Sequence, residues 1–216
     1  MLVQASGRPI LGAGDHERLR ARAAEGVRRA RRTGECLVAI TVALDATADP
    51  TAIAVASRAV PTRSRAGEDW FCFEHPDRDR FSLAALGRAA ALDDCGKGRF
   101  ERVAERWRAL VAGAVCDDGG PVAVGGFAFA PEGGSAPHWA GFSPASLHVP
   151  EVAIARRGAQ VTLTLAAVAA PDDDPDGLVA RLEERAATLR SAPLPLLDPD
   201  PTGRYRVVSA MPPEHY

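Results

Sequence analysis

The feature that most constrains the fold is a pair of alternating segments, "EVAIA" and "AQVTLTLAAV", on either side of Arg157-Gly158. In both segments apolar and polar residues alternate, and a period of two is typical of strands with one buried face. A short connection that contains glycine is typical of a hairpin. The pattern therefore predicts two neighbouring antiparallel strands, around which the other elements must be arranged.

Several other segments are rich in β-branched or aromatic residues and predict further strands. "FSLAALGRAAAL" (81–92) fits a strand or a helix equally well. The turn "DATADP" separates the first two predicted strands. The predicted strands are "CLVAITVAL" (36–44), "TAIAVASRAV" (51–60), "DWFCFE" (69–74) and "RYRVVSA" (204–210).

Three segments predict helices. The first runs from Asp15, as its cap, to about Thr33 and stops at Gly34. The second, 98–115, has its large apolar residues on one face. The third, 176–192, is amphipathic, with Asp176 as its cap. The apolar face of the second helix comprises Phe100, Val103, Trp107, Leu110 and Val111.

The order of these elements favours an α+β fold with a mainly antiparallel sheet and helices packed on one face, because regular βαβ spacing is missing. We expect helices 98–115 and 176–192 to share that face. The 216 residues fit one large domain or two small ones, and we interpret 1–216 as a single domain. The segment 193–203 is predicted to be a proline-rich connection.

Composition excludes several classes of function. The formal charge of −2 does not indicate binding to nucleic acid or to an anionic membrane. No apolar run reaches the ~20 residues that span a bilayer, and the first residues lack a secretory pattern. Four scattered cysteines without zinc-ligand spacing are expected to be free, buried thiols in the cytoplasm. They are Cys36, Cys72, Cys95 and Cys116.

One formal motif indicates calcium. "DDDPDGLVARLE" places Asp172, Asp174, Asp176, Gly177 and Glu183 at the spacing of an EF-hand loop. An EF-hand also requires an incoming helix, whereas a strand-like segment and Pro171 come before this loop. We therefore expect an acidic helix cap rather than a calcium site.

No other pattern predicts chemistry. The five histidines form no i,i+2 or i,i+4 metal-ligand pair, and the serines at 135, 143 and 146 lack a nucleophile-elbow context. Glu68-Asp69 and Asp93-Asp94 are expected in turns. We therefore nominate no catalytic, cofactor-binding or metal-binding residue in this chain.

The stretch "GPVAVGGFAFAP" (120–131) combines adjacent glycines with alternating aromatic residues. Paired glycines weaken a strand and indicate a bulge or a close approach of another backbone. We expect the approach at Gly126, with a valine there more costly than at Gly134 in the "EGGS" loop. Phe127 and Phe129, two residues apart, are expected to be buried on one face.

These residues also carry a family resemblance. "GGFAFAP" followed by "HWAGFSPASLHVPEVAIARRG" resembles the N-terminal half of isochorismate synthase, in the chorismate-utilising enzyme family. The family motif is a Gly-Gly-Phe-x-Phe strand, a Trp and a Phe, and an "lPev" strand that opens a hairpin. The matching residues are Gly125, Gly126, Phe127, Phe129, Trp139, Phe142 and Val149-Pro150-Glu151-Val152.

The resemblance extends over about residues 60–216. Upstream, the segment 69–92 is similar to one with aromatic strands and an "lG.a" turn, and "GRFERVAERWRAL" resembles the helix before the glycine strand. Ala130 departs from the family, which often has Asp there. The two phenylalanines favour the isochorismate and salicylate synthase branch over the branches with a glycine-tyrosine strand.

The resemblance implies that chorismate gains water at one ring carbon and loses hydroxide from another, using a lysine base, a glutamic acid and a magnesium ion held by glutamates. The family motifs for these groups match nothing here, and the single lysine, Lys97, lies in a "CGKGRF" turn. We therefore interpret the chain as the N-terminal domain of an isochorismate synthase of menaquinone or siderophore synthesis. Its expected partner is a C-terminal chorismate-binding half, on a longer chain or on a separate one, and magnesium would belong to the complete enzyme. The alternative is a stand-alone, non-catalytic module that binds a ligand or partner.

Overall fold

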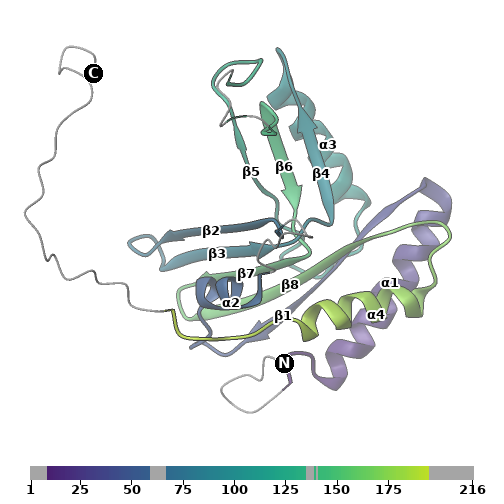
Figure 1. The fold of residues 1–216 in the computed structure, drawn as a ribbon. Coiled ribbons are helices and arrows are strands. Elements are labelled where there is room, and N and C mark those ends of the chain that lie inside the picture. The colour runs from purple at the N-terminus through teal and green to yellow at the C-terminus, as the bar shows by residue number, and fades with distance from the viewer. Residues whose placement is uncertain (1–8, 59–66, 135–138, 140, 195–216) are drawn as a thin grey trace, which may run out of the picture.

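The computed structural model describes residues 9–58, 67–134, 139 and 141–194. Two antiparallel sheets form its framework, and helices lie against both (Figure 1). The helices are α1 (Ala13–Thr33), α2 (Pro50–Ser57), α3 (Arg99–Gly113) and α4 (Pro175–Ala187). The strands are β1 (Cys36–Leu44), β2 (Trp70–His75), β3 (Phe81–Leu86), β4 (Ala90–Asp94), β5 (Val124–Phe127), β6 (Ala145–Val149), β7 (Val152–Arg157) and β8 (Gln160–Ala169).

The larger sheet has five strands in the order β1-β8-β7-β3-β2. The predicted hairpin lies at its centre: β7 pairs with β8 from Val152 opposite Leu165 to Arg157 opposite Gln160. Gly158 supplies the left-handed backbone of the turn, with φ of 59°. Every pairing between the named strands is antiparallel, so the predicted α+β fold class is confirmed.

The main core lies between this sheet and the helices α1, α2 and α4. Alternate residues of β1 point into it, from Cys36 to Leu44. Leu163 and Leu165 of β8 are completely buried there, as is Leu178 of α4. The period-two pattern of the sequence thus becomes one buried face of the sheet.

The smaller sheet has three strands in the order β4-β6-β5 and is covered by α3. The C-terminal half of α3 also covers the second face of the larger sheet, because Trp107 and Leu110 pack on Leu37 and Ala39. These β1 residues alternate with those that face α1 and α4. The expectation that helices 98–115 and 176–192 share one face was therefore wrong, since they lie on opposite faces of β1 and β8.

The segment 51–60, predicted as a strand, is helical from Pro50 to Ser57. Asp49 caps this helix by accepting a hydrogen bond from the Ala52 N–H at 3.0 Å. Pro50 occupies the first turn, where its missing N–H costs nothing. Asp49-Pro50 is thus a helix start rather than the end of a turn, and the burial of Ile53 and Ala54 explains the apolar composition.

Other boundaries also differ from prediction. Gly12 is the N-cap of α1, and the predicted cap, Asp15, instead accepts a hydrogen bond from the Gly12 N–H at 2.8 Å. The stop at Gly34 is confirmed by its φ of 96°. The ambiguous segment 81–92 forms β3 and the start of β4, separated by residues 87–89. The predicted strand 204–210, and all but the first two residues of the connection 193–203, lie outside the described residues.

None of the described helices combines the length and the apolar character that a bilayer-spanning helix needs. Cys36, Cys72, Cys95 and Cys116 are free, as predicted. Only Cys36 is fully buried, whereas Cys95 is exposed because it lies in the turn before α3.

Candidate functional site

The two sheets are joined by two short links that run side by side. One link, from Gly87 to Ala89, connects β3 to β4, and the other, Pro150-Glu151, connects β6 to β7. The Ala89 N–H donates to the Val149 carbonyl at 2.8 Å, which holds the links together. The structure therefore brings the "lG.a" and "lPev" motifs into contact, although they are far apart in the sequence.

An ion cluster fastens α4 to this junction. Arg185 of α4 pairs with Glu68 and, through its Nε, with Glu151 Oε2 at 2.9 Å. The Arg185 and Glu68 side chains are only 17% and 14% exposed. Gly87 leaves room for Glu151, because a β-carbon at Gly87 would lie 2.4 Å from Glu151 Oε2. Its φ of +69° independently favours glycine.

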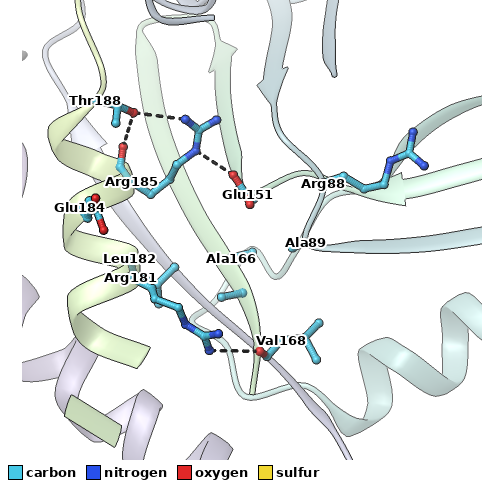
Figure 2. Close-up of a pocket in the computed structure, with 11 residues that line it drawn as sticks. Arg88, Ala89, Glu151, Ala166, Val168, Arg181, Leu182, Glu184, Arg185 and Thr188 are labelled. Carbon is cyan, nitrogen blue, oxygen red and sulfur yellow. Dashed lines mark hydrogen bonds and ion pairs between the residues drawn. The ribbon is translucent and has the colours of Figure 1, made fainter. Parts of the chain in front are cut away.

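A hollow of about 460 Å³ opens between α4 and the junction (Figure 2). Apolar atoms of Ala89, Ala166 and Leu182 line part of it. Each of its three guanidinium groups lies within ion-pair distance of a carboxylate: Arg185 as above, Arg181 with Asp173 at 2.8 Å, and Arg88 with Asp69 at 2.8 Å. This arrangement is suited to holding α4 against the junction, and its cations are already neutralised by the chain itself.

His148 of β6 lies in the smaller sheet, opposite Ala91 of β4 and Val124 of β5. Burial lowers its pKa below the usual 6.5, and the charge of Arg88 lowers the pKa further, whereas Asp69 and Asp93 act in the opposite direction. The folded state thus favours the neutral ring.

This pKa shift predicts a pH dependence of stability. The unfolded chain protonates His148 at higher pH than the folded chain does, so stability is present above about pH 6.5 and is lost as the pH falls through the folded pKa. When the pH is lowered from above 6.5 to below the folded pKa of His148, the urea midpoint should fall less in His148→Gln than in the wild type. An equal drop in both proteins would show that His148 does not contribute.

The acidic loop 172–183 is a helix start. Asp174, rather than the predicted Asp176, caps α4 by accepting a hydrogen bond from the Gly177 N–H at 3.0 Å. Glu183, the last ligand of the EF-hand pattern, instead contacts His16 Nδ1 of α1 at 2.7 Å. Among the described residues no group of three or more His, Cys, Asp or Glu could hold a metal ion.

We expect Asp174→Ala to lower the free energy of unfolding by about 1 kcal/mol, the usual cost of losing an N-cap. The loss should be the same with and without calcium. Calorimetric titration of the wild type should show no calcium binding tighter than about millimolar. Asp172→Ala, an exposed neighbour, is the control. Micromolar calcium binding that Asp174→Ala abolishes would restore the EF-hand interpretation.

Large aromatic side chains are exposed around β5 and the N-terminal end of α3. Phe100 and Phe127 form a ring pair with centroids 5.0 Å apart, and Trp139 and Phe142 form another at 6.1 Å. β5 ends at Phe127, so Phe129 lies beyond the strand. We call these residues the aromatic surface; they are Phe100, Phe127, Phe129, Trp139 and Phe142, each at least 45% exposed.

Two predictions about the segment 120–134 were wrong. Phe127 and Phe129 are not buried on one face: Phe127 is half exposed at the end of the edge strand β5, and Phe129 lies beyond the strand and is fully exposed. The close backbone approach exists, but at Gly125: a β-carbon there would lie 1.9 Å from the Ser146 carbonyl oxygen. Gly126 faces open space, whereas a β-carbon at Gly134 would meet the Trp139 ring at 2.3 Å, so the expected ranking of these two glycines was wrong.

Sequence reasoning missed the junction because its ion pairs join residues that are far apart in the chain. The glycine of "LGRA" and the "VPEV" stretch were noticed separately, but nothing in either motif indicates that they meet. Arg99 was also missed: it is a charged residue that is 4% exposed, and arginine is rarely so buried. No local sequence signal distinguishes it from the other arginines of α3.

Comparison with known proteins places the chain in a family. The chorismate binding enzyme family matches residues 23–216. The chain therefore belongs to the chorismate binding enzyme family, and the predicted resemblance is confirmed at that level. No curated protein sequence matches the chain.

Among solved structures, the menaquinone-specific isochorismate synthase MenF of Escherichia coli is similar to this chain, with a TM-score of 0.45 and 16% sequence identity. The match covers 82% of this chain and 35% of that one. The chain thus spans about a third of the length of that protein.

Proposed function

We propose that this chain is the N-terminal structural domain of an isochorismate synthase and that it acts together with a C-terminal chorismate-binding half. The observation that carries the proposal, beside the family membership, is the aromatic surface. An exposed cluster of large apolar side chains marks an interaction site in a folded protein. A domain that packs against a second half in the working enzyme would leave such a surface uncovered when it is alone.

The position of the aromatic surface supports a protein partner rather than a small ligand. Phe127 lies on the edge strand β5, Phe100 lies in the first turn of α3, and the other three residues lie between β5 and β6 (Figure 1). None of the five lines the hollow beside α4. Phenylalanine and tryptophan are enriched at protein interfaces, where they supply large contact areas. An apolar face of the chorismate-binding half is the occupant that we propose.

The chemistry of the reaction would come from that half. Adding water to chorismate and removing its hydroxyl group requires a base and an acid, because one group must accept a proton and the other must donate one. Lys97 lies in the turn between β4 and α3, where its carbonyl accepts a hydrogen bond from Arg102 at 2.8 Å, and it does not match the family's base. The described residues hold no carboxylate cluster that fits magnesium, so the ligands of the metal would come from the chorismate-binding half.

The stand-alone module is the second candidate, and the hollow beside α4 is the feature that would favour it. Its guanidinium groups are paired with carboxylates of the same chain, as described above. An anionic ligand would have to displace those carboxylates. This competition makes the domain interpretation the better supported of the two.

We expect the purified chain alone to convert no chorismate to isochorismate, with or without magnesium. The assay would follow the product by chromatography and would include the complete enzyme of a family member as a positive control. Turnover that copurifies with the chain through several columns, and that a Lys97→Met variant loses, would overturn the proposal.

A further inference from the structure

Arg99, the first residue of α3, is buried although it is charged. Its guanidinium donates hydrogen bonds to backbone carbonyls from three separate segments. Nη1 donates to Gly96 at 3.4 Å, Nε donates to Pro144 at 3.4 Å, and Nη2 donates to Ala128 and, at 3.2 Å, to Phe129. One side chain thus bonds to the turn before α3, to the segment directly after β5 and to the segment that leads into β6.

None of these acceptors is a carboxylate. Arg102, one turn further along the helix, shows the contrast, because it is half exposed and pairs with Asp94 at 2.6 Å. Burying a charge without an opposite charge is costly, and buried ionic groups are weak contributors to stability. The contacts of Arg99 are therefore better suited to fixing the relative positions of the three segments than to increasing the free energy of unfolding.

Three of the four carbonyls, those of Ala128, Phe129 and Pro144, belong to segments that carry the exposed rings. Ala128 and Phe129 directly follow Phe127, and Pro144 comes two residues after Phe142. The Pro144 carbonyl also accepts a hydrogen bond from the Ala128 N–H at 2.8 Å. The segment after β5 is therefore bonded directly to the segment before β6. On the helix side, the guanidinium lies 4.3 Å from the centroid of the Phe100 ring.

We infer that Arg99 is a positioning residue that holds the two ring pairs of the aromatic surface in one arrangement for docking. The inference rests on the proposed function for the identity of the partner. Its local part, the ordering of the three segments, holds for the chain alone. Without the Arg99 guanidinium, the segments after β5 and before β6 lose the hydrogen-bond donor that they share. The positions of the two ring pairs relative to one another are then no longer fixed.

Hydrogen exchange of the chain alone tests the local part. Arg99→Met should raise exchange several-fold in 124–134 and 141–145, while α1 and β8 exchange as in the wild type. Arg102→Met, which removes a charge from the same helix, should leave 124–134 unchanged. Unchanged exchange in Arg99→Met, or a uniform rise over the whole chain, would overturn the inference. If Arg99→Met does not fold, Arg99→Lys takes its place, because one ammonium cannot reach all four carbonyls and the same segments should respond.

Association with a separately produced chorismate-binding half tests the docking part. Arg99→Met should weaken binding by about tenfold, equivalent to about 1.4 kcal/mol, while its urea midpoint stays near that of the wild type. Equal binding by wild type and variant would overturn the inference and leave the proposed function standing. Failure of the wild type to bind at all would instead overturn the proposed function, and the exchange experiment would still decide the role of Arg99.

Discussion

Gly125→Val is expected to destabilise the chain by about 3 kcal/mol or more, the upper end of overpacking costs. The added β-carbon would lie 1.9 Å from the Ser146 carbonyl oxygen and 2.9 Å from the Leu147 α-carbon. Both are backbone atoms of the paired strand β6, so no side-chain rotation relieves the clash. The β5–β6 pairing must open, and the aromatic surface would lose its support.

Gly126→Val is the matched control because it makes the same change one residue further along β5. Nothing lies within 4 Å of a β-carbon at Gly126, so the cost should stay below about 1 kcal/mol, as for an ordinary exposed site. Urea unfolding of the two variants measures the difference. If Gly125→Val unfolds like the wild type, or Gly126→Val is the worse variant, the register of β5 on β6 is wrong.

Gly26→Ala is expected to destabilise the chain by roughly 1–3 kcal/mol, although alanine is the better helix former by about 1 kcal/mol. Gly26 lies on the buried face of α1, and a β-carbon there would be 2.1 Å from Val38 Cγ2. Val38 is fully buried and its branched side chain is stiff, so it has little freedom to move away. The overlap therefore outweighs the gain in helix propensity.

Gly14→Ala, in the first turn of the same helix, should be neutral or stabilise by a few tenths up to about 1 kcal/mol. Gly14 is exposed and has nothing within 4 Å of its would-be β-carbon. Thermal or urea melts of both variants compare an identical substitution at two positions of α1. Destabilisation by Gly14→Ala together with stabilisation by Gly26→Ala would contradict the packing of α1 on β1.

The sequence was sufficient to predict elements whose pattern is local. The alternation on both sides of Gly158 predicts the central hairpin because each strand has one buried face. Helix 98–115 is predicted within a few residues, since its apolar residues recur at helical spacing. The strand predicted for 51–60 is wrong because a short apolar run without clear periodicity fits a strand and a helix equally well. Asp49-Pro50 suits a turn as well as the helix start that it forms.

Features that depend on contacts distant in the sequence could not be predicted. The burial of Phe127 was inferred from its alternation with Phe129, but alternation does not show whether a partner covers that face. The pairing of Arg185 with Glu151 depends on how α4 meets the link between the sheets. The family resemblance is visible in the sequence because its motifs contain glycines with steric roles. Gly125 and Gly87 are two of them, since a β-carbon at either would clash with a neighbour.

Reconstitution from two separately produced halves measures whether this chain is one part of an isochorismate synthase. The chain and a chorismate-binding half from the same genome would be produced separately, mixed, and assayed for isochorismate. We expect turnover only in the mixture, and we expect Phe127→Ser to weaken association of the halves while the urea midpoint of this chain changes little, because Phe127 is half exposed. A chorismate-binding half that is fully active alone and gains nothing from this chain, or a Phe127→Ser variant that associates as tightly as the wild type, would contradict the account.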